Sequence, residues 1–358
     1  MKIASLQYLR GLAALLVVLA HNSSILQGGL LSHLPGALGV DVFFIISGFI
    51  MTYITCHATE KPALFIIKRF FRIWPAFFVF WLLSYLLVYP ERTFQHMACS
   101  LYFCLQDYSL PAPTFGYSAL GPPWTLSYEI MFYLIFSFAM SVSYRYRSYV
   151  CALVFILSSV GLQLYYNGHF EFSSQASPDL VVTQWWQGWI KLISNTIFFE
   201  FIAGMLLAEW ALGGKLPNLT PAGRTFTLLA LLLAIISAGV IGPQVFGISG
   251  GFWLALVIMT AVIMLSYHRE AGRNRALLFL GDISYSLYLV HYSVMVFVIK
   301  VMPENASPIE RLGLFMLSIT AGIALAAAMF KWIEKPAIQA GKKVADALFK
   351  RRAVPGAT

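Results

Sequence analysis

The sequence predicts an all-α, polytopic membrane protein with about ten transmembrane helices and with both termini in the cytoplasm. Of its 358 residues, 59% are hydrophobic and only 11% are charged, whereas soluble domains carry about 25% charged residues. The hydrophobic residues also gather in runs of roughly 20, the length that an α-helix needs to cross a bilayer. So few polar residues cannot cover a water-soluble core of this size, and lipid must cover it instead.

Ten hydrophobic runs follow one another along the chain, and each is expected to form one helix across the membrane. They cover residues 6–26, 38–56, 73–90, 125–143, 149–166, 192–210, 226–242, 251–267, 279–300 and 312–334. The first run begins beside Lys2 and Arg10, as a signal peptide would. No small-x-small cleavage site follows it, so we expect a retained helix.

The formal charge of +9 is concentrated between these runs. With the N-terminus in the cytoplasm, nearly all Lys and Arg of the connecting segments fall on the cytoplasmic side. The external exceptions are Arg92, Lys191, Lys300 and Arg311. The inverted topology would reverse that distribution, which the positive-inside rule disfavours. Nucleic-acid binding is not expected, because it needs a basic patch on a soluble surface.

The chain is expected to form one membrane-embedded domain over residues 1–336, followed by a basic cytoplasmic tail over residues 337–358. Basic residues between Lys342 and Arg352 predict an amphipathic or membrane-surface segment in this tail. Two external segments, 91–124 and 167–191, are long enough to contribute to a site. The second carries Trp185, Trp186 and Trp189, which are typical of membrane-interface anchors and are also suited to lining a sugar site.

Arg10 and His21 lie inside the first span, where an ionisable side chain costs a few kcal/mol and therefore marks a candidate functional site. They are eleven residues apart, which closes three helical turns to within about 20° and places them on one face about 16 Å apart. Arg10 is then near the cytoplasmic side and His21 lies past the middle of the bilayer. The structural alternative is a snorkelling arginine and a hydrogen-bonded interior histidine.

Carboxylates occur on two other spans at a depth expected to match that of His21. Asp41 opens the second span and Glu129 lies one turn into the fourth, both near the external side. Three such groups on three helices are suited to acid-base chemistry, although Asp41 also fits a helix N-terminus. His291 in the ninth span is a second-rank candidate, and Glu200 in the sixth has no evident partner in the sequence.

A basic cluster, Lys68, Arg69 and Arg72, precedes the third span on the cytoplasmic side. Clusters of this kind commonly anchor a topology. Guanidinium forks also hold phosphates well, so the cluster is equally suited to binding the phosphates of a coenzyme A donor. Sequence spacing leaves both interpretations open.

Six motifs, taken in order along the chain, resemble those of the integral-membrane acyltransferase-3 family. They are LQYLRGLAALLVVLAH with Arg10 and His21, GVDVFFIISGF with Asp41, Ser47 and Gly48, KRFFRIWP with Arg69, Arg72 and Pro75, PPWTLSYE with Trp124 and Glu129, SYSLYLVH with Ser284 and His291, and IEKP with Glu334 and Pro336. The resemblance runs from Leu6 to Pro336 and is to exopolysaccharide-modifying members without a fused esterase-like domain.

The resemblance implies ten membrane helices in a bacterial inner membrane and an acyl-CoA donor, with acetyl-CoA as the default. The acceptor is a hydroxyl of a surface polysaccharide or of its lipid-linked sugar precursor, and polysaccharide-biosynthesis proteins are the expected partners. It also implies that Arg10 and His21 are required and that Arg69 and Arg72 are important. Trp124, Ser284 and His291 are further candidates for substrate contacts. No metal is expected, because the four cysteines are too scattered for a zinc site.

His21 is the expected general base on the acceptor hydroxyl, because a neutral imidazole titrates in the required range. Asp41 or Glu129 would orient its ring, and Arg10 would bind the donor pyrophosphate or stabilise charge on the thioester oxygen. An acyl-enzyme on a serine or on His21 is the alternative route. The alternative function is a polysaccharide-related transporter or flippase, since intramembrane Arg, His and carboxylates also mark transport paths.

Overall fold

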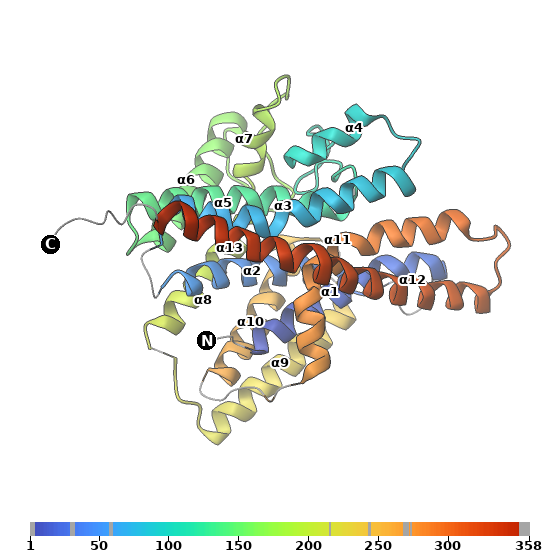
Figure 1. Cartoon of the computed structure of the whole chain (residues 1–358). Coiled ribbons are helices and arrows are strands. Elements are labelled where there is room, and N and C mark those ends of the chain that lie inside the picture. Colours follow the sequence, from blue (N-terminus) through green and yellow to red (C-terminus); the bar gives the residue numbers. More distant parts are fainter. Residues whose placement is uncertain are drawn as a thin grey trace.

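The computed structural model describes residues 4–28, 33–56, 60–214, 216–242, 245–267, 272 and 274–350. Within these ranges the regular structure is helical and contains no β-strand, which confirms the predicted all-α fold (Figure 1). Among the described residues, eight helices are long and apolar enough to cross a membrane. A pair of helices bent by 50° at a short break makes a ninth span if the two cross together.

Every predicted span has a helix in the structure. These helices are α1 (Ala4–Asn22), α2 (Gly36–Ile54), α3 (Pro62–Leu87), α5 (Thr125–Val142), α6 (Arg147–Asn167), the bent pair α7 (Gln187–Ile193) and α8 (Phe198–Leu212), α9 (Pro221–Ile241), α10 (Phe252–Ser266), α11 (Arg275–Val301) and α12 (Pro308–Met329). Helix α10 is the short one, at 15 residues. Helix α3 begins well before its predicted start at residue 73, because the basic residues that suggested a loop lie in its first half.

Helices α1 and α11 approach each other closely at two glycines. A Cβ atom on Gly11 would lie 2.7 Å from the backbone N of Gly281, and one on Gly281 would lie 2.2 Å from the carbonyl O of Gln7. Small residues at a crossing let helix backbones pack together inside a bilayer. Arg10, next to Gly11, is thereby brought against α11.

The crossing of α2 and α8 depends on glycine in the same way. A Cβ atom on Gly48 would lie 2.1 Å from the carbonyl O of Phe201, and one on Gly204 would lie 2.0 Å from the carbonyl O of Ile45. Backbone cannot move aside as a flexible side chain can. This contact fixes α2, which forms one wall of the cavity described below.

The segment between α3 and α5 packs onto the bundle. It contains the short helix α4 (Phe94–Ala98), and the indole Nε1 of Trp81 donates a hydrogen bond to the Met97 carbonyl at 2.9 Å. Its far end is held by the Tyr128 hydroxyl, which donates to the Pro113 carbonyl at 2.8 Å. The 3₁₀ turn Pro122–Trp124 then leads directly into α5 and sets the position of Glu129.

Helix α12 continues into α13 (Lys335–Lys350) through one π-helical turn, Phe330–Glu334. The rod from Pro308 to Leu348 has 41 residues, about 60 Å at the α-helical rise. Its last part packs along α3, where a Cβ atom on Gly341 would lie 2.5 Å from Cβ of Phe71. The predicted domain boundary at residue 336 thus falls inside a continuous helix, and the described part of the expected tail is packed on the bundle (Figure 1).

A test of the α2–α8 contact is the substitution Gly204→Ala. We expect a Tm several degrees below wild type in detergent, since one kcal/mol corresponds to about 1–2 °C in a chain of this size and the added Cβ meets backbone. Gly161→Ala on α6 is the matched control, because a Cβ there meets nothing within 4 Å. Equal Tm values for the two variants would contradict the contact.

Candidate active site in the membrane domain

A cavity of about 520 Å³ lies among α1, α2, α3, α5, α11 and α13. Its lining contains several charged groups, although the helices that enclose it are largely apolar. The polar and charged lining residues are Gln7, Arg10, Ser47, Arg69, Arg72, Thr125, Glu129, Tyr133, Asp282, Ser284, Tyr285, Tyr288 and Lys342. Guanidinium groups predicted on two separate segments, the first span and the basic cluster, therefore share one space.

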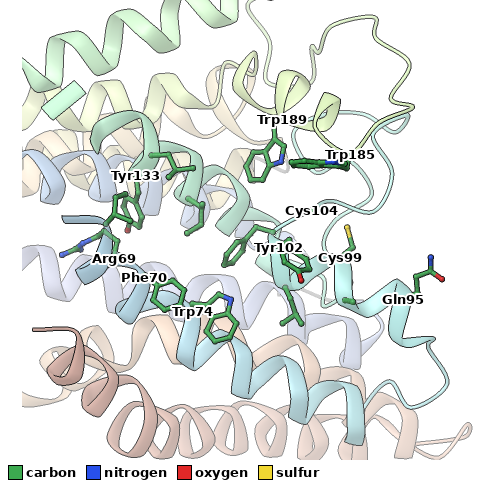
Figure 2. A pocket seen from close by; sticks show the side chains of 16 residues that line it. Arg69, Phe70, Trp74, Gln95, Cys99, Tyr102, Cys104, Tyr133, Trp185 and Trp189 are labelled. Atoms are coloured by element: carbon green, nitrogen blue, oxygen red, sulfur yellow. The ribbon is translucent and has the colours of Figure 1, made fainter. Parts of the chain in front are cut away.

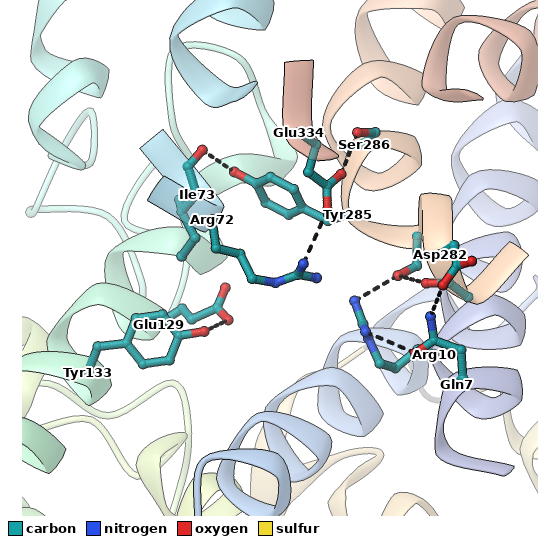
Figure 3. A network of polar contacts seen from close by, with 12 residues as sticks. Gln7, Arg10, Arg72, Ile73, Glu129, Tyr133, Asp282, Tyr285, Ser286 and Glu334 are labelled. Atoms are coloured by element: carbon teal, nitrogen blue, oxygen red, sulfur yellow. Dashed lines mark hydrogen bonds and ion pairs between the residues drawn. The ribbon is translucent and has the colours of Figure 1, made fainter. Parts of the chain in front are cut away.

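Arg10 is held on its own helix and on α11. Its guanidinium donates to Gln7 Oε1 at 3.3 Å and to Ser284 Oγ at 3.0 Å. The Gln7 amide in turn donates to Asp282 Oδ1 at 2.7 Å, and Ser284 donates to the Gly281 carbonyl at 2.9 Å. These partners orient the Arg10 guanidinium toward the cavity (Figure 3). Among the described residues no carboxylate forms an ion pair with it.

Arg72 reaches the same space from α3 and forms an ion pair with Glu334, with 3.3 Å between Nη1 and Oε1. Glu334 is fully buried, and its other oxygen accepts a hydrogen bond from Ser286 at 2.7 Å. Tyr285 donates to the Ile73 carbonyl at 2.9 Å and so ties α11 to α3 beside this pair (Figure 3). A charge inside a membrane protein needs such partners, because lipid offers none.

Arg69 faces the cavity between two rings, with its Cζ 5.6 Å from the centroid of Phe65 and 6.0 Å from that of Tyr133. Its Nε is buried and has no hydrogen-bond partner among the described residues. Arg69 also lines the cavity, so a ligand in the cavity would lie beside its positive charge.

Glu129 points into the cavity from α5, opposite Arg10 and Arg72 (Figure 3). It accepts hydrogen bonds from the Tyr133 hydroxyl and, at 3.4 Å, from Ser47 Oγ. Glu129 was also a candidate to orient the His21 ring, but its hydrogen-bond partners in the described part of the chain are Tyr133 and Ser47.

His21 and His291 form a pair beside the cavity, with 3.2 Å between His21 Nδ1 and His291 Nε2. His21 Nδ1 also lies 3.0 Å from the Val17 carbonyl, and His291 Nδ1 lies 3.2 Å from the Leu287 carbonyl. Carbonyl oxygens only accept, so each Nδ1 carries the hydrogen when the rings are neutral. His21 Nε2 is then an unprotonated nitrogen with no protein partner in the described chain. The ring is partly exposed.

Tyr288 connects this histidine pair to the cavity. It lines the cavity, and its ring centroid lies 5.8 Å from that of His291. Its hydroxyl donates to the Pro122 carbonyl at 2.7 Å and accepts from Thr125 at 3.0 Å. Tyr288 therefore contacts both the cavity and the ring of His291.

Asp41 lies elsewhere, which differs from the expectation that it orients His21. Its Oδ1 accepts from the Gly247 amide at 3.0 Å, and a Cβ atom on Gly251 would lie 2.3 Å from its Oδ2. Glu200 on α8 faces the same loop, 3.5 Å from a Cβ atom built on Gly247. The two glycines let this loop approach α2 closely, and Asp41 binds the loop there. Glu200 lies beside the same loop, which is a neighbour that the sequence did not reveal.

Two other candidates also have structural contacts. Lys68 forms an ion pair with Glu60 and, unlike Arg69 and Arg72, is not among the lining residues of the cavity. Trp124 is buried against aromatic neighbours, with its ring centroid 6.4 Å from that of Phe44 and 5.0 Å from that of Phe246. Ser284 does line the cavity, as a hydrogen-bond partner of Arg10.

Sequence reasoning missed Tyr133, Asp282 and Lys342 as lining residues and gave Glu334 no role. Tyr133 follows Glu129 by one helical turn, so the i, i+4 spacing was a usable signal. Glu334 was visible only as part of the IEKP motif. Nothing in the sequence indicates that α13 continues from α12 and packs along α3.

A second, largely apolar groove of about 780 Å³ meets the cavity at Arg69 and Tyr133, which line both. From there it passes Phe70 and Trp74 and reaches Trp185 and Trp189 (Figure 2). Phe70 is 46% exposed and Trp185 is 75% exposed. In a bilayer such a surface faces hydrocarbon, so lipid has access to a groove that ends at the charged cavity.

The fold and the site define a multi-pass membrane protein with a cation-rich internal cavity beside a histidine pair. The chain belongs to the acyltransferase-3 family, since the acyltransferase domain that defines the family matches residues 3–331. Arginines that bind an anionic substrate, beside a group able to move a proton, are chemically consistent with acyl transfer.

Several curated proteins are similar to the chain. The exopolysaccharide production protein ExoZ of Rhizobium meliloti (strain 1021) is 30% identical over 326 residues, which cover 86% of this chain and 91% of that protein. The peptidoglycan O-acetyltransferase OatA of Listeria monocytogenes is 25% identical, over 93% of this chain and 55% of that protein. A putative O-acetyltransferase of Staphylococcus aureus (strain COL) is 24% identical, over 95% of this chain and 58% of that protein. No solved structure matches the chain.

The Arg72–Glu334 pair can be tested by a double-mutant cycle on Tm. Arg72→Ala alone leaves a buried carboxylate without its cation and is expected to destabilise strongly, whereas adding Glu334→Ala recovers part of the loss. The exposed pair Lys300–Glu91, with side chains 45% and 58% exposed, is the control and should show no measurable coupling. Additive effects at Arg72 and Glu334 would contradict a buried pair.

Proposed function

We propose that the protein transfers an acyl group, acetyl by default, from acyl-CoA to a hydroxyl of a surface polysaccharide or of its lipid-linked sugar precursor. The observation that carries the proposal is the single cavity lined by Arg10, Arg69 and Arg72 in a chain of the acyltransferase-3 family. Relatives named for exopolysaccharide production and for O-acetylation support a carbohydrate acceptor. The expected location is the bacterial inner membrane.

The donor is proposed to enter the cavity from the side of α13, with its phosphates beside Arg69 and Arg72. Guanidinium groups bind phosphate oxygens through paired hydrogen bonds, and both Arg69 and Arg72 line the cavity. Arg10 lies between α1 and α11 on the same cavity, where its guanidinium would bind the pyrophosphate of the donor. The neutral partners of Arg10 leave that charge available.

His21 is the proposed general base. Its Nε2 takes the proton of the acceptor hydroxyl, the oxygen attacks the thioester carbonyl carbon, the C–S bond breaks, and the CoA thiolate leaves and regains a proton. His291 and the Val17 carbonyl hold the ring in the tautomer that leaves Nε2 free. His291 thus takes the orienting role that was expected of a carboxylate.

The apolar groove supports the lipid-linked form of the acceptor. A hydrocarbon chain is stabilised where it covers an apolar surface. The groove offers such a surface and reaches the cavity at Arg69 and Tyr133.

The central experiment is to incubate purified protein with labelled acetyl-CoA and acceptor, and to measure both free CoA and labelled acceptor. Movement of unmodified sugar without CoA release would support the transporter alternative instead.

Arg10→Lys keeps the charge and loses the guanidinium fork. We expect turnover to fall by about 100-fold or more, the scale of losing one stabilising donor, with unchanged Tm. Arg145→Lys is the matched control, because Arg145 lies on the exposed α5–α6 connection and should leave turnover unchanged. Wild-type turnover in Arg10→Lys would remove Arg10 from the reaction.

The two histidines are expected to differ in their effect on activity. His21→Gln removes the base and should lower turnover by about 100-fold or more, whereas His291→Phe removes only the orienting acceptor and should leave clearly more activity. His169→Gln, at an exposed position, is the control. A greater loss in His291→Phe than in His21→Gln would reverse the assignment of the base.

A further inference from the structure

Helix α13 reaches the cavity as well as covering α3. Ile338 and Lys342, one helical turn apart, both line the cavity, and residues at i and i+4 share a helix face. The adjacent Gly341 packs on Phe71 with no room for a side chain. The chain following the last membrane span therefore supplies a wall of the site.

The ion pair of Glu334 with Arg72 sets this placement. Glu334 ends the π-helical turn, and its bonds to Arg72 and Ser286 fix the start of α13 between α3 and α11. Lys342 follows eight residues later, about 12 Å further along the helix axis. It directly follows Gly341, which packs on Phe71 beside Arg72.

Of the cations that line the cavity, Lys342 is the most exposed to solvent. It is exposed and forms no ion pair within 4 Å in the part of the chain that the structure describes. The carboxylates that line the cavity are Glu129 and Asp282. Glu129 accepts from Tyr133 and Ser47, and Asp282 accepts from Gln7. An anion at the cavity mouth would therefore meet an available ammonium.

We propose that Lys342 binds the nucleotide phosphates of the acyl-CoA donor at the mouth of the cavity. This inference rests on the proposed function. A compact ammonium on a flexible stem suits a wet entrance, whereas the arginines hold the more buried part. Helix α13 is then part of the donor site, with its Lys342 a substrate-binding residue.

The neighbouring lysine provides a matched control. Lys343 follows Lys342 on the same exposed stretch, is rotated by about 100° around the helix, and does not line the cavity. The same charge change at the two positions therefore separates a specific contact from general attraction of anions to a basic helix.

The test measures binding of CoA, and of 3′,5′-ADP as a probe that carries phosphates without the pantetheine arm, to purified full-length protein in lipid nanodiscs. Lys342→Glu should raise both Kd values about tenfold or more, Lys342→Arg should stay near wild type, and Lys343→Glu should stay within about twofold. In turnover assays Lys342→Glu should raise KM for acetyl-CoA more than it lowers kcat.

Equal Kd values for Lys342→Glu and Lys343→Glu would overturn the inference, whether both are weakened or both match wild type. Failure of the wild-type protein to bind CoA or to release it from acetyl-CoA would instead overturn the proposed function. Thermal unfolding of each variant shows whether weak binding comes from loss of the fold. If Lys342→Glu does not fold, Lys342→Ala with the same probes decides the question.

Discussion

The site depends on one constraint, that guanidinium groups placed among membrane helices must find their polar partners within the protein. Arg72 finds Glu334, and Arg10 finds Gln7 and Ser284. Each partner comes from a helix whose position is fixed by close packing. The contact between Gly11 and Gly281 is what brings Ser284 within reach of Arg10. The close packing of glycines therefore also brings the polar partners that the buried charges need.

Because their partners differ, the three arginines are suited to different roles. Arg72 is compensated by a buried carboxylate, which holds α13 and α3 together. Arg10 has neutral partners and keeps its charge for a substrate, and Arg69 keeps an unpartnered Nε. An acyl-CoA donor would use both properties, because its phosphates need cations that are fixed in place and are not neutralised by the protein.

The fold could be predicted from the sequence because hydrophobic runs of membrane-spanning length are a strong signal. Arg10, Arg69, Arg72 and Glu129 could be chosen as candidates for a similar reason, since charge within or beside a span is costly. Which groups meet could not be predicted. Helical periodicity places His21 on a face of α1 but does not reveal that the facing residue is His291.

Asp41 shows that two side chains expected at the same depth in the membrane need not lie together. It was grouped with His21 because both were expected at the same level, yet it holds the loop at Gly247 and Gly251. Glu334 and Lys342 show the converse. Glu334 ends the last predicted span, and Lys342 belongs to the expected basic tail. Only the close packing of Gly341 on Phe71 places that tail at the cavity.

The most direct test of the central claim, that this cavity is the donor site, is a cryo-EM structure with a non-transferable acyl-CoA analogue. The account predicts density in the cavity, with the phosphates beside Arg10, Arg72 and Lys342 and the acyl end toward His21. Ordered analogue in another part of the protein, with the cavity empty, would contradict it.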